Sequence, residues 1–367
     1  MRIYAPEYYK NFKCIGGECP ANCCIGWEID IDEDTLRLYA DMGGEIGEKI
    51  RASIETVGDV PHFRLTEEER CPHLNDKNLC NIITECGENS VCEICREHPR
   101  YYNEYHDLKE IGVGLACPAA AKLILRNDEF CVEPLGEIVH DLAPADETLL
   151  YVLKAFRWEI FRLLSFNVGL GIDTVIPFIC DNSRYTVDLC VSDLESGVYS
   201  RDNFTPDRFL FPDEPYGDIN ANDMERTRDI YLSLDLLDED FRNEMKAAFN
   251  LAQFEDFYYN ADLDFSFFLY NGGDEYFARL LFYFLHRYML AGAVDGEYDL
   301  RIRHSIICSY LCVAIGYLRG GSFADVAKAA VDLSRNIEYS EDNLERIIFS
   351  LDKDGYLPPL WVGQLFE

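Results

Sequence analysis

The segment at 14–24, Cys14-Ile15-Gly16-Gly17-Glu18-Cys19-Pro20-Ala21-Asn22-Cys23-Cys24, places four thiols within eleven residues. Glycine and proline stand between the thiols, so the backbone is free to wrap a small object and its exposed amides can donate to sulfur. Short cysteine motifs follow: CPHL at 71–74, LCNI at 79–82, CEIC at 92–95 and CP at 117–118. This pattern predicts a cysteine-rich, loop-rich module at the front of the chain.

The cysteine count indicates the compartment. The chain has 15 cysteines, an odd number that cannot be fully paired in disulfides. The first residues, Met1-Arg2-Ile3-Tyr4-Ala5-Pro6-Glu7, carry no apolar stretch behind the basic residue, so we expect no secretory signal. We therefore expect a cytoplasmic protein with reduced thiols, in which closely spaced cysteines are metal ligands or catalytic groups before they are bridges.

Composition restricts the partners. The 67 acidic and 33 basic residues give a formal net charge of -34. A chain this acidic repels phosphate backbones and anionic lipid surfaces, so we expect no nucleic-acid partner and favour a basic protein surface. The 367 residues are 48% hydrophobic, which excludes a disordered chain and allows about two domains.

The cysteines are unevenly distributed and suggest where the domains divide. Eleven of the fifteen fall at or before Cys131. Pro134-Leu135-Gly136 and Ala143-Pro144 follow and are typical of a boundary. We expect a cysteine-rich metal module over 1–140 and a mainly helical domain over 141–367.

Apolar spacing predicts the helices of the second part. From Asp146, a plausible N-cap, apolar residues recur at helical spacing through Leu164. Ser322 followed by Asp325 resembles a capping signal, and Ser340 precedes another amphipathic run.

Two strongly apolar stretches are candidates for either membrane spans or buried core helices. They are Tyr276 to Leu290, interrupted by charged residues, and Ser305 to Leu318, with about 14 residues where a membrane span needs about 20. We interpret both as buried core helices and expect no membrane insertion.

Strands are expected only as a minor component. Trp27 to Asp32 alternates apolar and acidic residues, and Leu108 to Leu115 is a weaker candidate. The predicted fold is mainly α, with the loop-rich cysteine module packed on a larger helical domain and minor β structure.

The cysteine spacing favours a metal site. A CxxC unit such as Cys92 and Cys95 places two thiolates close enough to share one metal or one cluster face. Several cysteines stand beside proline, and the paired spacing usual for zinc is missing, so we favour an iron–sulfur site. Zinc and unmetallated core thiols remain as alternatives.

Other cysteines have a simpler interpretation, because free cysteine is among the most buried residue types. We expect core thiols at Cys180, Cys190, Cys308 and Cys312. We interpret Cys86 and Cys131 as bystanders.

The radical S-adenosylmethionine motif CxxxCxxC is not met. Cys19 and Cys23 supply its first interval, but Gly26 stands at the third position. A cluster-bound radical mechanism is therefore not supported.

The whole order of motifs resembles a known family. Cys14-x4-Cys19-x3-Cys23-Cys24-x2-Trp27, CPHL, LCNI, CEIC, His98-Pro99-Arg100 and Cys117-Pro118 are similar to the flagellin lysine N-methylases of the FliB type. The chain is also distantly similar to the YkgJ-type cysteine-cluster proteins. The specific likeness covers roughly residues 1–125, and Cys86 departs from it where an apolar residue is expected.

The resemblance implies a cytoplasmic enzyme that binds a [4Fe-4S] cluster and methylates ε-amines of flagellin lysines with S-adenosylmethionine. Nine cysteines match the pattern as candidate metal ligands: Cys14, Cys19, Cys23, Cys24, Cys71, Cys80, Cys92, Cys95 and Cys117. One such cluster takes four cysteines, so either there are two clusters or several of the nine are structural. Neighbours such as Cys23 and Cys24 cannot usually reach the same iron.

Candidates for the rest of the chemistry are weaker. Tyr101, Tyr102 and Tyr105 are candidates to line an amine pocket, although we favour ordinary packing as their role. Gly112-Val113-Gly114 is a near match to a nucleotide turn but lacks the third glycine, so we interpret it as a turn or strand end. The sequence identifies no catalytic base, donor pocket or oligomeric state.

Three functions remain open. The first is the lysine methylase, with flagellin as its protein substrate. The second is a non-catalytic iron–sulfur carrier with a helical interaction domain, and the third is a zinc-stapled scaffold. Broad absorption near about 400 nm separates iron–sulfur from colourless zinc protein.

Overall fold

The computed structural model describes residues 1–27, 29–165, 172–210, 221–251 and 263–352, which form two compact units. The cysteine-rich unit consists of Phe12–Tyr101 and Cys117–Ala120. The helical unit consists of Met1–Asn11, Tyr102–Ala116 and the described residues from Ala121 onward. The sequence predicts one division near residue 140. In the structure, the chain passes from one unit to the other after residues 11, 101, 116 and 120.

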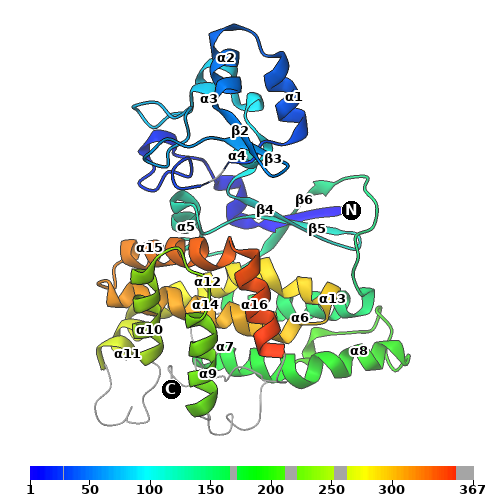
Figure 1. Cartoon of the computed structure of the whole chain (residues 1–367). Helices are drawn as coiled ribbons and strands as arrows, with labels where there is room; N and C mark the ends of the chain where they lie inside the picture. The colour runs from blue at the N-terminus through cyan, green and yellow to red at the C-terminus, as the bar shows by residue number, and fades with distance from the viewer. Residues whose placement is uncertain (28, 166–171, 211–220, 252–262, 353–367) are drawn as a thin grey trace. The chain divides into compact units, whose positions relative to one another are not determined.

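The cysteine-rich unit has short elements joined by loops (Figure 1). Its helices and strands are η2 (Gly16–Glu18), α1 (Glu33–Asp41), α2 (Gly44–Ser53), β2 (Ile54–Val57), β3 (Val60–Phe63), α3 (Asn81–Cys86), η3 (Glu88–Ser90) and α4 (Glu93–Glu97). Strands β2 and β3 form an antiparallel hairpin. The loop-rich character expected for this part of the chain agrees with these short elements.

Asp32 joins two helices of this unit. Its Oδ1 accepts from the Thr35 amide at 2.9 Å and caps α1, and its Oδ2 accepts from the Glu93 amide at 2.8 Å at the start of α4. Each bond satisfies an amide that the helix itself leaves unpaired. One carboxylate therefore fixes the start of α4 relative to α1.

In the segment from Trp27 to Asp32, predicted as a strand, the described residues form a single bridge, between Asp30 and His62 of β3. The predicted alternation is present, because Ile29 and Ile31 are buried at 4% exposure each. Glu28 lies outside the described residues. The strand prediction is wrong because main-chain pairing here does not extend into a ladder.

A four-stranded sheet belongs mainly to the helical unit, with the order β4-β5-β1-β6. Its strands are β1 (Arg2–Pro6), β4 (Arg100–Tyr105), β5 (Leu108–Val113) and β6 (Val132–Glu137). Strand β1 lies parallel to β5, with Arg2 opposite Leu108, and antiparallel to β6. The prediction at Leu108 to Leu115 is confirmed by β5, and Gly112-Val113-Gly114 is the end of that strand.

Helices make up most of the remaining described chain, which confirms a mainly α fold (Figure 1). They are η1 (Glu7–Asn11), α5 (Pro118–Ile124), α6 (Glu147–Ser165), α7 (Ile172–Asp181), η4 (Asn182–Thr186), α8 (Val187–Glu195), η5 (Pro206–Arg208), α9 (Ala221–Leu232), α10 (Glu239–Leu251), α11 (Leu263–Phe268), η6 (Leu269–Gly273), α12 (Asp274–Tyr288), η7 (Met289–Ala291), α13 (Gly292–Asp295), α14 (Tyr298–Leu318), α15 (Phe323–Leu333), η8 (Ser334–Glu338) and α16 (Glu341–Asp352).

Three helix starts match the sequence. Asp146 accepts from the Leu149 amide at 2.8 Å and caps α6. Ser322 and Asp325 form the reciprocal capping box of α15. Ser340 Oγ accepts from the Asn343 amide at 3.2 Å at the start of α16.

The two apolar stretches form α12 and α14, which pack against each other in the core of the helical unit. Gly316 allows α15 to approach α14 closely, because a Cβ there would lie 2.6 Å from Val326 Cγ2. Within the part of the chain that the structure describes, none of the helices has the length and apolar character that a bilayer crossing requires. The prediction of core helices is confirmed.

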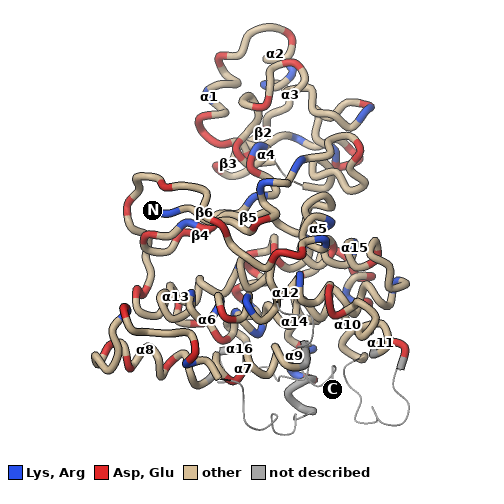
Figure 2. Tube along the Cα trace, turned by 180° about the vertical axis from the view of Figure 1, so that it is seen from behind, with Lys and Arg blue, Asp and Glu red and all other residues tan. Residues whose placement is uncertain are grey.

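Acidic residues are distributed along both units (Figure 2). Lys and Arg residues are fewer and are interspersed among them. The acidity is therefore a general property of this chain and does not by itself mark one binding face.

Candidate metal centre

The nine candidate ligands all lie in the cysteine-rich unit. All fifteen cysteines of the chain are described, and the structure forms no disulfide among them. Cys131 lies in the helical unit, apart from the nine.

Main-chain hydrogen bonds attach the first cysteine loop to the second. The Cys71 amide donates to the Cys24 carbonyl at 2.8 Å, and the Gly26 amide donates to the Glu69 carbonyl at 2.8 Å. The Asn81 amide donates to the His73 carbonyl at 2.8 Å, which brings the CPHL and LCNI motifs together. Segments far apart in the sequence therefore converge through their backbones.

Four of the nine thiols belong to one small core or pack against it. Cys71 and Cys92 are part of its buried set, at 7% and 0% exposure, and Cys24 and Cys80 pack against it. Cys95 follows on α4, and its Sγ lies 3.9 Å from Cys92 Sγ. The remaining core residues are Ile29, Ile31, Tyr39, Ile50, Phe63, Ile82 and Val91. Cys86 also packs on this core, beside Cys80.

Three thiols stand directly before short helices. Cys80 precedes α3, Cys92 precedes α4 and Cys117 precedes α5. Backbone amides of the first helical turn act to lower the pKa of the Cys80 and Cys117 thiols. Amide donors at a helix start stabilise a thiolate, which is the form that binds metal.

Burial opposes this ionisation. Burial raises the pKa of the Cys71 thiol to about 11, and it raises the pKa of Cys80 and Cys117 despite their amide donors. A hydrogen bond between the Cys92 and Cys95 thiols lowers the pKa of Cys92 and raises the pKa of Cys95. Thiolates this close repel each other, and a bound metal ion would supply a compensating charge while the protons leave.

The Cys92–Cys95 spacing fits metal ligation. Two thiolates bound at about 2.3 Å to one tetrahedral ion lie about 3.8 Å apart. The observed 3.9 Å agrees with that separation. Among the described residues, however, no group of three or more Cys, His, Asp or Glu side chains already stands in a coordinating arrangement. The donor chemistry fits a metal, and the complete ligand set stays a prediction.

The outer thiols belong to the first loop. Cys14 Sγ accepts from the Gly16 amide at 3.4 Å. Gly17 is required here, because a Cβ would lie 2.3 Å from the Lys77 carbonyl oxygen. Cys19 and Cys23 both lie close enough to Cys117 for their charges to raise its pKa. Cys14 and Cys23 are exposed, and Cys19 is partly exposed.

Two residues near the thiols were not identified from the sequence. The Tyr39 hydroxyl lies 4.0 Å from Cys92 Sγ. His73, although it stands in the CPHL motif, is a core residue: its Nε2 lies 2.9 Å from Ser53 Oγ and its ring packs on Phe63. Tyr39 lies seven residues after the helix cap Asp32, about two helical turns. This spacing was the only sequence signal that could have placed Tyr39 near Asp32 and the cysteines.

The tyrosine candidates lie in different surroundings, and the cysteines predicted to be core thiols are buried. Tyr105 is buried on β4, while Tyr102 is 43% exposed with Lys109 Nζ 5.0 Å from its ring centroid. Neither these residues nor Tyr101 is among the residues lining the cavity described below. The core thiols are confirmed, since Cys180, Cys190, Cys308 and Cys312 are at most 1% exposed.

Comparisons with known proteins give distant relatives. No protein-family model matches the chain, and no solved structure matches it. The flagellar biosynthetic protein FliU of Salmonella muenchen is 25% identical over 37% of this chain and 83% of its own length. The likeness to YkgJ-type proteins receives no support from these comparisons and stays a prediction.

Two proteins named lysine-N-methylase, from Salmonella choleraesuis and Salmonella typhimurium, are each 25% identical over 222 residues, which is 54% of this chain. The chain spans about half the length of these two relatives, 52% in each case. By sequence, the chain is therefore similar to proteins named for the methylation of lysine.

Proposed function

We propose that this protein is a protein-lysine N-methyltransferase that uses S-adenosylmethionine, acts on flagellin lysines and carries an iron–sulfur cluster in its cysteine-rich unit. The observation that carries the proposal is the likeness to the two Salmonella lysine-N-methylases. The name of the FliU relative, a flagellar biosynthetic protein, supports a flagellar substrate.

The acceptor amine sets a physical requirement. An amine must be neutral to attack the methyl group, and lysine has a pKa of about 10.4. Keeping it neutral near pH 7 costs about 4–5 kcal/mol, at about 1.36 kcal/mol for each unit of pKa. Partial burial of the amine and a proton acceptor beside it would meet this cost.

Five thiols are the best candidates to hold the cluster, namely Cys24, Cys71, Cys80, Cys92 and Cys95, of which four would suffice. Four of them share one core, Cys95 lies beside Cys92, and Asp32 fixes the helix start that carries Cys92. A bound cluster would supply cross-linking of three chain segments, and electron transfer where a reaction needs it. Cys14, Cys19, Cys23 and Cys117 form the outer group.

A zinc-stapled or other non-catalytic metal module is the second candidate. It is favoured by one distance, because two ligands 3.9 Å apart match a single tetrahedral ion, whereas each cysteine of a [4Fe-4S] cluster binds a different iron. In that case the cysteine-rich unit would stabilise the fold and the helical unit would bind a partner.

A methyl-transfer assay tests the proposal. Anaerobically purified, reduced protein is incubated with S-adenosylmethionine and flagellin from the same host, and flagellin peptides are analysed by mass spectrometry. We expect lysines that are heavier by about 14 Da for each added methyl group. Methylated lysines keep their positive charge. Absence of the mass shift, with metal content intact, would favour the non-catalytic module.

A further inference from the structure

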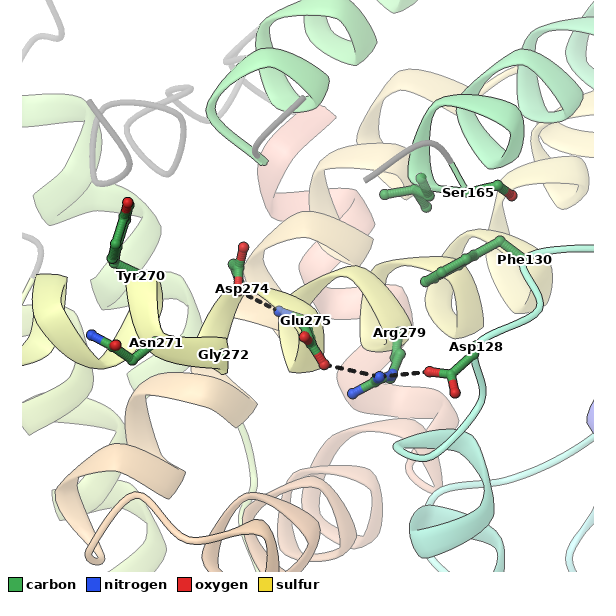
Figure 3. Close-up of a pocket in the computed structure, with 10 residues that line it drawn as sticks. Asp128, Phe130, Ser165, Tyr270, Asn271, Gly272, Asp274, Glu275 and Arg279 are labelled. Carbon is green, nitrogen blue, oxygen red and sulfur yellow. Dashed lines mark hydrogen bonds and ion pairs between the residues drawn. The ribbon is translucent and has the colours of Figure 1, made fainter. Parts of the chain in front are cut away.

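A cavity of about 510 Å³ opens in the helical unit, where η6 meets α12. Figure 3 shows side chains of Tyr270, Asp274, Glu275 and Arg279 on this side, with Asp128 and Phe130 on the facing segment. Its volume lies in the range of about 300–1,000 Å³ that is typical of ligand pockets. The metal candidates are all in the other unit.

Glycines set the shape of this site. Gly272 has φ of 110°, which breaks the helix between α11 and α12. A Cβ on Gly273 would lie 2.8 Å from Phe268 Cε1, so the kink packs closely. The break leaves the Tyr270 side chain 88% exposed beside the cavity.

The cation in the lining is already neutralised. Arg279 Nη2 lies 2.7 Å from Asp128 Oδ1 and 3.0 Å from Glu275 Oε2 (Figure 3). Its Nε donates to the Asn127 carbonyl at 3.0 Å. Two carboxylates therefore surround one guanidinium. The third carboxylate of the lining, Asp274, adds further negative charge.

Asp274 is the carboxylate of the lining that forms no ion pair among the described residues. Its Oδ1 accepts from the Glu275 amide at 2.9 Å, which orients it at the start of α12. It is half-buried, and among the described residues no Lys or Arg lies within ion-pair distance of it. Burial raises the pKa of this carboxyl above its usual value, as expected when a carboxylate leaves water without a cation to replace it.

The geometry points to a guest with a cationic tip and an apolar stem. We propose that the cavity holds the acceptor lysine of the protein substrate, with its ammonium group paired to Asp274 and its methylene stem beside Phe130 and Tyr270. Aromatic rings attract such cations, and lysine stems pack on apolar surfaces while the head stays polar. This inference rests on the proposed function and names the substrate site for it.

A binding measurement tests the site without any methyl transfer. The probe is a short synthetic peptide with one lysine, compared by calorimetry with the same peptide carrying norleucine, which keeps the stem and lacks the ammonium. We expect the full-length protein to bind the lysine peptide about tenfold more tightly, about 1.4 kcal/mol. Equal binding of the two peptides would overturn the proposal, and this comparison needs no variant to fold.

A charge-matched pair of variants locates the effect. Asp274→Asn should remove the preference for lysine over norleucine. Asp264→Asn removes the same charge from the exposed first turn of α11 and should leave the preference intact. An equal loss in both variants would mean that net charge alone attracts the peptide, and it would overturn the assignment to this cavity.

Steady-state kinetics separate this site from the donor site. Asp274→Asn should raise KM for the flagellin substrate about tenfold and leave KM for S-adenosylmethionine unchanged. A raised KM for the donor alone would assign the cavity to the donor and contradict the proposal. If the wild-type protein transfers no methyl group yet binds the lysine peptide through Asp274, the proposed activity fails and the site stands.

Discussion

Cys92 Sγ and Cys95 Sγ lie 3.9 Å apart, at the start of a five-residue helix whose first amide is held by Asp32. Cys92 is fully buried, whereas Cys95 is exposed. The pair therefore spans from the core to the surface of the cysteine-rich unit.

Removing one thiol of this pair should release the metal. Cys92→Ser should lose at least half of the bound metal and lower the stability of its unit, because metal binding is coupled to folding in such modules. The measurement is metal content by plasma emission after anaerobic purification. Cys308→Ser is the matched control: Cys308 is also 0% exposed but lies on α14, so it should keep the metal and lose about 1–3 kcal/mol of stability. Equal metal loss in both would show that our division of the cysteines is wrong.

Tyr39→Phe removes the hydroxyl that lies 4.0 Å from Cys92 Sγ. Groups that hydrogen-bond to ligands typically contribute about 10–100-fold in metal affinity, so we expect faster metal loss to a chelator at unchanged initial stoichiometry. Tyr310→Phe is the control, because its hydroxyl donates to the Ala248 carbonyl in the helical unit. Identical chelation rates in the wild type and Tyr39→Phe would exclude a role for this hydroxyl.

The helical unit contains a buried ion pair that joins α6 to β5. Arg157 Nη1 donates to Glu110 Oε2 at 2.8 Å, and both residues are at most 6% exposed. Glu110→Gln leaves a buried guanidinium without its counter-charge and should cost about 3–5 kcal/mol in urea unfolding. The double variant Glu110→Gln with Arg157→Met should recover much of that loss. A single variant as stable as the wild type would contradict the pairing.

Acidification should destabilise the helical unit through His304. Burial lowers the pKa of His304 to about 3, and its Nδ1 lies 2.8 Å from the Tyr231 hydroxyl. In the unfolded chain a histidine takes up a proton near pH 6.5, so between about pH 6.5 and pH 3 the unfolded state binds more protons. The free energy of unfolding should therefore decrease as the pH is lowered through this window, by up to about 1.4 kcal/mol per pH unit from this group.

The variant His304→Asn tests this pH dependence through the slope of the free energy of unfolding against pH. His304→Asn should be less stable than the wild type at neutral pH but should lose less stability on acidification. Urea unfolding at several pH values measures both slopes. Parallel slopes would show that His304 does not contribute to the pH dependence.

Local patterns in the sequence predicted the parts of the fold that depend on neighbours in the chain. Asp146, Ser322 and Ser340 mark helix starts because a capping side chain acts within three residues. The burial of α12 and α14 followed from their apolar composition.

Long-range pairing was not predictable from these patterns. Arg2 pairs with Leu108 and with Glu137 in the sheet, and nothing local in β1 specifies either partner. The same reason explains why residues 102–116 belong to the helical unit although cysteine motifs lie on both sides of them.

The candidate site divides in the same way. Cysteine spacing identified the thiols, because CxxC acts over one helical turn, as it does at Cys92 and Cys95. It did not identify Tyr39, which is 53 residues from the cysteine it approaches, or the cavity at Asp274, which needs a kink and segments distant in the sequence. Tertiary contacts create these features.

The most direct test of the account is the metal content of the full-length protein, purified without oxygen from cells supplied with both iron and zinc. The account predicts about four irons and four acid-labile sulfides for each filled cluster, with broad absorption near about 400 nm. Cys92→Ser should abolish this signal and Cys308→Ser should retain it. Colourless protein with neither iron nor zinc, and with its thiols still fully reduced, would contradict the claim that these cysteines converge to bind metal.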